Sequence, residues 1–152
     1  MAKNSAKGTA RNAGERWRVI VYSVTALIAL VGLADATFLT VAHLTGDDAV
    51  CGSSAGCSAV LGSAYAAVAG IPTAAFGALA YFVVFSTSVL ASFGYASART
   101  LLDLVVAVMF AATLGLLYVQ AFVLHAFCPF CLLSAALTFL LDGIVVATPS
   151  IR

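Results

Sequence analysis

Charged side chains are scarce in this chain, because Asp, Glu, Lys and Arg together make up only 9% of its 152 residues. A soluble globular domain carries charge on about a quarter of its residues, and about half of its residues are apolar. Since 63% of this chain is hydrophobic, the composition excludes an ordinary soluble globule. It indicates an integral membrane protein of one domain.

A surplus of one sign of charge is also missing, since the formal net charge is only +1. Nucleic-acid-binding domains carry clustered Lys and Arg that neutralise phosphates, so we expect no nucleic acid partner. The sequence has no internal repeat and no low-complexity segment. It consists instead of long apolar runs that alternate with short polar connections.

Four of these runs are long enough to cross a bilayer, whose hydrocarbon core needs roughly 20 residues of helix. The chain is therefore predicted to be an all-α membrane protein, a bundle of four transmembrane helices. The predicted spans are residues 19–44, 71–91, 101–124 and 128–147, within a transmembrane domain of residues 19–148. A basic tail without regular structure, residues 1–18, precedes this domain, and residues 149–152 follow it.

The first span and the loop after it each contain a second local signal. Residues 34–36, Ala-Asp-Ala, have the small-x-small form of a signal cleavage site, but the helical pattern continues beyond them and favours a span. In the loop, the alanine-rich residues 58–68 predict a short helix on the membrane surface. Tyr65 suits that interface, where aromatic rings with a polar tip collect.

The placement of the charges predicts the orientation of the bundle. With four spans, all seven Lys and Arg residues fall on the side of the two termini, and the opposite side carries Asp47 and Asp48. Excess Lys and Arg mark the cytoplasmic face. We therefore expect both termini in the cytoplasm and all four cysteines at the outer surface.

The four cysteines form two close pairs, Cys51 with Cys57 and Cys128 with Cys131. Pro129 is favoured as the first residue of a helix, which makes Cys128 the predicted N-cap. The helix dipole lowers the pKa of a thiol at this position, and apolar surroundings raise it. Because both pairs lie at one membrane surface, they are predicted to meet when the four spans form a bundle, and the flexible loop pair can then exchange disulfides with the pair at the helix start. A lipid-soluble two-electron acceptor, a quinone, would complete such a relay.

Other uses of four cysteines remain open at this point. Two structural disulfides are one alternative, although a bond between Cys128 and Cys131 within one helical turn would constrain little. A zinc site built from four thiolates is another. A c-type haem attachment is excluded, because it needs a histidine where the chain has Leu132.

The motifs together resemble the bacterial vitamin K epoxide reductase homologues, in a stand-alone form without a fused thioredoxin-like domain. The resemblance runs from about residue 19 to residue 147. The elements that carry it are Cys51-x5-Cys57, the segment 58–66, the segment 70–77 with Pro72 and Gly77, and Cys128-Pro129-Phe130-Cys131.

This resemblance implies an enzyme, a quinone-dependent thiol–disulfide oxidoreductase. Cys51 and Cys57 would oxidise a separate thioredoxin-fold protein, Cys128 would exchange with this pair, and Cys131 would lie nearest the quinone. The quinone would be of the menaquinone, ubiquinone or phylloquinone type, with no metal. It also implies the bacterial cytoplasmic membrane and extracytoplasmic disulfide formation.

Further residues are candidates for the quinone site. Ser63 matches a small hydroxyl of the family. Thr73 stands where some members, the animal ones among them, have an asparagine near the quinone carbonyl. Ala135 stands where animal members have a tyrosine of the vitamin K site, which argues for a respiratory quinone over the epoxide. Aromatic candidates are Phe76, Tyr81, Tyr118, Phe122 and Phe127, and candidate proton donors are Asp35, His43 and His125. Gln120 is given a hydrogen bond between helices.

Two other functions remain as alternatives. One is a quinone or vitamin K epoxide reductase that recycles its substrate. The other is a non-catalytic four-span protein with structural disulfides.

Overall fold

The computed structural model describes residues 2–46, 51–52 and 54–148, with side chains described from Gly14 onward. Asp47, Asp48 and the segment 149–152 lie outside the described residues. The four long helices are α1 (Ala2–Thr45), α3 (Thr73–Ser92), α4 (Ala96–Tyr118) and α5 (Pro129–Ala147). All four are long and apolar enough to cross a membrane, counting α4 with the turn that follows it. The predicted four-helix membrane bundle is thus confirmed.

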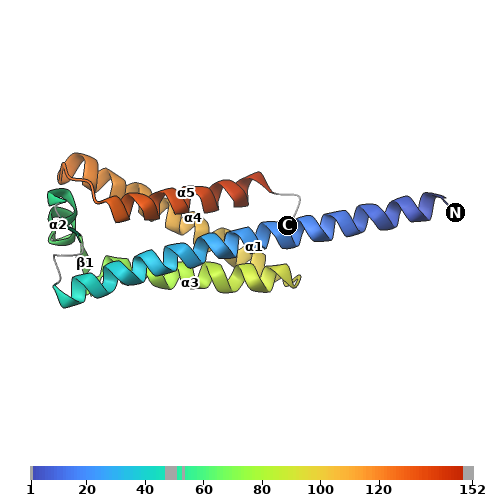
Figure 1. Ribbon diagram of the computed structural model, residues 1–152, viewed down its shortest axis with the longest axis horizontal. Helices are drawn as coiled ribbons and strands as arrows, with labels where there is room; N and C mark the ends of the chain where they lie inside the picture. The colour runs from blue at the N-terminus through green and yellow to red at the C-terminus, as the bar shows by residue number, and fades with distance from the viewer. Residues whose placement is uncertain (1, 47–50, 53, 149–152) are drawn as a thin grey trace.

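One end of the bundle carries the short elements of the first loop. Helix α2 (Ala55–Leu61) lies across this end, and the long N-terminal part of α1 projects from the opposite end (Figure 1). The alanine-rich segment was expected to be helical over 58–68, but the helix begins three residues earlier and stops at Leu61. Gly62 ends it, because its N–H closes the last turn onto Ser58 O at 2.9 Å.

A short β-hairpin, with two residues in each strand, follows α2 and was not predicted. Strands β1 (Ala67–Val68) and β2 (Ile71–Pro72) pair antiparallel. Ala69 and Gly70 turn between them with φ of 53° and 82°, as the favoured two-residue hairpin turn requires. This hairpin directs the chain into α3.

The boundaries of the helices differ from the predicted spans at two places. Helix α1 begins at Ala2 instead of near residue 19, so the tail that was predicted to lack regular structure is helical. No proline interrupts this alanine-containing tail. Helix α4 begins at Ala96, so Arg99 lies in its first turns and not in the preceding connection. The connection itself contains Gly94, whose φ of 97° suits glycine.

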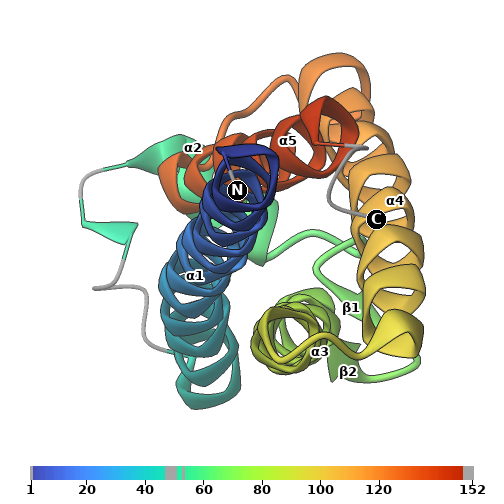
Figure 2. The same ribbon diagram turned by 90° about the vertical axis from the view of Figure 1, so that its right-hand side faces the viewer.

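Close packing of α1 on α3 forms most of the core. Ala29 and Ala36 lie seven residues apart on α1, buried against Tyr81 and Val84 of α3. Small side chains let the backbones of membrane helices approach. Gly32 shows this most directly, since a Cβ atom there would overlap the ring of Tyr81. The helices surround this core when the bundle is viewed along its length (Figure 2).

Candidate functional site

Helix α5 begins at the second cysteine pair. Cys128 has the extended backbone of an N-cap, and Pro129 occupies the start of the helix as predicted. Cys131 lies one turn into the helix, and its thiol hydrogen-bonds to the sulfur of Cys128. Both cysteines are free thiols.

The surroundings of Cys128 favour its thiolate. The hydrogen bond from the Cys131 thiol, assisted by the backbone N–H groups of Cys131 and Phe130, lowers the pKa of Cys128 to about 6. Burial acts in the opposite direction, since desolvation penalises the charged form. The direction expected from the start of the helix is therefore the one found, and a thiolate at this position is a good leaving group in disulfide exchange.

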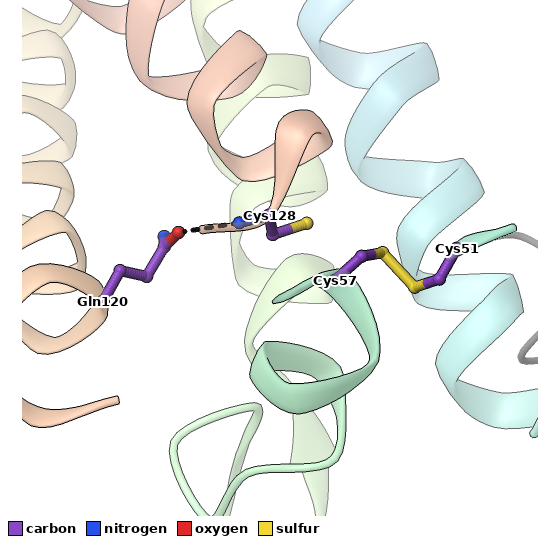
Figure 3. Close-up of a disulfide and its surroundings, with 4 residues drawn as sticks. All are labelled: Cys51, Cys57, Gln120 and Cys128. Atoms are coloured by element: carbon purple, nitrogen blue, oxygen red, sulfur yellow. Dashed lines mark hydrogen bonds between the residues drawn. A yellow bond between two sulfur atoms is a disulfide. The ribbon is translucent and has the colours of Figure 1, made fainter. Parts of the chain in front are cut away.

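The loop pair is a disulfide that lies against Cys128. Cys51 and Cys57 are bonded, with 5.4 Å between their Cα atoms. They form one buried cluster with Cys128, and Val60, Leu61, Phe130 and Cys131 pack against it. Figure 3 shows the Cys128 sulfur turned toward the disulfide, with Cys57 between Cys128 and Cys51. The fold thus brings both pairs to one end of the bundle.

A glycine allows this close approach. Gly56 precedes Cys57 on α2, and a Cβ atom there would lie 2.5 Å from the backbone oxygen of Phe127. Any larger side chain would push α2 away from the start of α5. From the sequence, Gly56 was expected only to contribute to the flexible segment that the loop pair encloses.

A π-helical turn, Val119–Val123, joins α4 to the cysteine pair. Such turns are rare and occur frequently at functional sites. Gln120 holds the following segment twice: its backbone oxygen accepts from Ala126 N at 3.1 Å, and its Oε1 accepts from Cys128 N at 3.2 Å. The second bond is the dashed line in Figure 3. A bond between helices was expected for Gln120, but its partner is the cysteine backbone.

A cavity of about 150 Å³ opens beside these cysteines. Residues from all four long helices and from the first loop line it, including Cys131, Ser134, Ala135 and Gln120. Its wall is mainly apolar, as expected of a site for a small hydrophobic molecule. Only Cys131 of the four cysteines lines it, so the two pairs are arranged as a series from the loop disulfide to the cavity.

The predicted quinone-site residues divide into two groups. Ser63 and Thr73 line the cavity, where their hydroxyls donate to Val60 O at 2.8 Å and Tyr65 O at 2.9 Å. The aromatic candidates do not line it. Tyr81 is buried, and the exposed ones are Phe76, Tyr118, Phe122 and Phe127.

Tyr81 acts on the cavity wall indirectly. Its hydroxyl donates to the backbone oxygen of Ser134 at 2.9 Å. It also lies 3.0 Å from Ser134 Oγ and 3.1 Å from Thr138 Oγ1. Tyr81 thereby holds the turn of α5 that follows Cys131.

The candidate proton donors are spread more widely. Asp35 is buried on α1, and its Oδ2 has no hydrogen-bond partner among the described residues. Its charge is close enough to raise the pKa of Cys128 slightly against the stronger lowering effects. His43 lines the cavity, and His125 lies in the tight turn before Cys128 with a φ of 48°.

A four-thiolate metal site does not fit this arrangement, because two of the four sulfurs are bonded to each other. Within the described part of the chain, no group of three or more His, Cys, Asp or Glu side chains is placed to hold a metal ion.

The sequence model of the vitamin K epoxide reductase family matches residues 23–146, which is most of the chain. A comparison with curated proteins gives no match.

Proposed function

The chain belongs to the vitamin K epoxide reductase family, and we propose that it oxidises a thioredoxin-fold protein and reduces a quinone. The family supports a membrane disulfide oxidoreductase. The observation that carries the finer proposal is the series formed by the Cys51–Cys57 disulfide, the Cys128 and Cys131 thiols, and the cavity beside Cys131.

The first exchange takes place at the loop disulfide. A thiolate of the partner attacks the sulfur of Cys51, and Cys57 leaves as a thiolate. The second thiol of the partner then displaces Cys51, so that the partner gains a disulfide and the loop pair becomes a dithiol. Cys51 is assigned to the partner because it is 7% exposed and Cys57 is fully buried.

The second exchange passes electrons inward. The Cys57 thiolate attacks the sulfur of Cys128 in an oxidised Cys128–Cys131 pair, and Cys131 leaves. Cys51 then attacks Cys57, which restores the loop disulfide and releases Cys128. Because its pKa is about 6, Cys128 is a good leaving group in this last step.

The third step reduces the quinone. The Cys128 thiolate and the Cys131 thiol give up two electrons and one proton, a disulfide forms between them, and the quinone takes a second proton from water to become a hydroquinone. Cys131 performs this step at the cavity. The structure holds the loop pair oxidised and the inner pair reduced, which is the state poised for it.

We also propose that the cysteine end faces outward from a bacterial cytoplasmic membrane, with both termini in the cytoplasm. Arg16 and Arg18 belong to the N-terminal part of α1, which projects from the end of the bundle opposite α2 (Figure 1). Arg99 belongs to the first turns of α4, and a Cβ atom on Gly94, in the turn before α4, would lie 4.0 Å from the Arg18 guanidinium. This arrangement obeys the positive-inside rule and places the disulfide where secreted proteins are oxidised.

The test uses the full chain in detergent or nanodiscs, with a reduced thioredoxin-fold protein and a soluble quinone analogue. We expect loss of quinone absorbance that is abolished by Cys131→Ala. The matched control is Ser58→Ala, an exposed change on α2 that leaves all four cysteines in place. This variant should retain activity. A static protein with structural disulfides would show no cysteine-dependent loss of quinone absorbance, and that result would remove the proposal.

A further inference from the structure

Gln120 is a buried amide at the junction between the cysteine pair and the cavity. It is 4% exposed, lines the cavity and is bonded directly to the backbone of Cys128. We propose that its carboxamide N–H donates a hydrogen bond to a carbonyl oxygen of the quinone. This inference rests on the proposed function and adds a substrate-binding residue to it.

The bond to Cys128 fixes which end of the amide is available. A glutamine side chain has one oxygen acceptor and one NH2 group with two donors. The oxygen accepts from Cys128 N at 3.2 Å, so the NH2 group is what Gln120 can offer to a molecule in the cavity. A quinone carbonyl is an acceptor and needs such a donor.

The other hydrogen-bond donors on the cavity wall already bond to protein atoms or lie farther from Cys128 than Gln120 does. The Ser63 and Thr73 hydroxyls donate to backbone oxygens, and the Ser134 hydroxyl lies in the hydrogen-bonded group around Tyr81. Thr113 also lines the cavity, but it precedes Gln120 by two helical turns, roughly 10 Å along the axis. His43 and Tyr65 belong to the wall formed by α1 and the first loop, whereas Gln120 contacts Cys128 itself.

Hydrogen bonds of the π-helical turn fix the position of Gln120. Leu124 N bonds to Val119 O at 2.9 Å, and Ala126 N bonds to Gln120 O at 3.1 Å. The backbone and the side chain of Gln120 are therefore both fixed before a quinone arrives. A donor held in advance at the site where charge develops stabilises the transition state, because no reorganisation is needed.

In the reaction, this donor faces the oxygen that gains electron density. As the disulfide forms between Cys128 and Cys131, two electrons enter the quinone, and the Cys131 thiol proton and a second proton from water end on its two oxygens. The Gln120 N–H remains on the amide and stabilises the negative charge before the proton arrives. Its contribution should therefore appear in the reduction of quinones and not in disulfide exchange.

The test compares two oxidants on the Gln120→Met variant, which keeps the length of the side chain and loses its polar atoms. The quinone analogue requires the proposed contact, and neutral 2,2′-dipyridyl disulfide oxidises the Cys128–Cys131 dithiol without it. We expect kcat/KM for the quinone to fall between about 10-fold and 100-fold, and the rate with dipyridyl disulfide to change less than about threefold. Thr87→Val, which removes a buried hydroxyl on α3 away from the cavity, should leave both rates unchanged.

Infrared spectroscopy gives a second readout, because a hydrogen bond lowers the stretching frequency of a bound quinone carbonyl. The lowered band should be present in the unaltered protein and shift up in Gln120→Met. An equal loss with both oxidants would mean that Gln120 acts only by holding Cys128, and a quinone kcat/KM within about twofold of the unaltered protein would exclude the contact. If the unaltered protein shows the lowered band without oxidising its thiols, the proposed function fails and the Gln120 contact stands.

Discussion

The ionisation of Cys128 depends on contacts within a single helical turn. Because the Cys131 thiol is the largest cause that lowers the pKa of Cys128 to about 6, Cys131→Ala should raise that pKa toward the ordinary value of about 8.5. Thiolate absorbance at 240 nm should rise with pH through about 6 in the reduced protein and at clearly higher pH in the variant. Below the midpoint the thiol form dominates, so attack of Cys128 on the Cys51–Cys57 disulfide, the reverse of the proposed exchange, should slow in acid. Equal midpoints in the two proteins would contradict this origin of the pKa.

Gly56 tests how closely the loop must approach the inner pair. Gly56→Ala places a methyl group 2.5 Å from Phe127 O, which is too close, so α2 must move away from Cys128. We expect the exchange between the two pairs to slow by at least about 10-fold, since misplacing reacting groups by about 1 Å can cost about 100-fold. Stopped-flow measurement of electron transfer from the loop dithiol would show it.

The control for this change is Gly115→Ala, whose added Cβ atom meets no other atom within 4 Å. Direct oxidation of the Cys128–Cys131 dithiol by a quinone should be normal in Gly56→Ala, because the cavity does not include that residue. A loss in both steps would indicate general unfolding and not a separation of the pairs.

At the scale of helices, α1, α3 and α5 are joined through one tyrosine. Gly32 on α1 gives the Tyr81 ring its space, and the Tyr81 hydroxyl bonds to Ser134 O on α5. Tyr81→Phe should cost about 1 kcal/mol of unfolding free energy through the lost hydrogen bond, and Gly32→Ala between about 1 and 3 kcal/mol through overpacking. Unfolding in mixed detergent measures both, and Phe82→Leu, an exposed change on the same helix, is the control. Equal stabilities would show that Tyr81 does not join the helices.

The sequence predicted the long elements well and the short ones poorly. Apolar length alone identifies a span, because every helix must fill the hydrocarbon core. The hairpin at Ala69 and Gly70 and the π-helical turn at Gln120 have no such signal. They depend on hydrogen bonds, from Thr73 N to Ala66 O and from Ala126 N to Gln120 O, that exist only after the helices have packed.

The candidate site was predictable to a similar extent. Span number and charge together indicated that the two cysteine pairs meet, since both must lie at one membrane surface. The cavity wall was not predictable in the same way, because the rotation of each helix decides which side chains face inward. Phe122 and Gln120 lie two residues apart on the same turn, yet Phe122 is 66% exposed and Gln120 lines the cavity. The preference for aromatic residues therefore pointed to a side of this turn that does not line the cavity, whereas Gln120 joins a wall that is otherwise mainly apolar.

The two ends of the whole molecule differ in charge, because the described basic residues and the cysteines lie at opposite ends. This difference should decide the orientation of the bundle in the membrane. In a variant without native cysteines, Ser58→Cys tests the exposed surface of α2, and Phe93→Cys tests the exposed turn between α3 and α4. We expect a membrane-impermeant maleimide added to intact bacterial cells to label Ser58→Cys and to label Phe93→Cys only after permeabilisation. The physical reason is that Lys and Arg are held on the cytoplasmic side during insertion. Arg18 lies beside the turn that contains Phe93 and Gly94, and Arg99 lies in the first turns of the helix that follows. The opposite pattern would place the loop disulfide in a reducing compartment, where it could not persist, and electrons could not then enter from an extracytoplasmic partner.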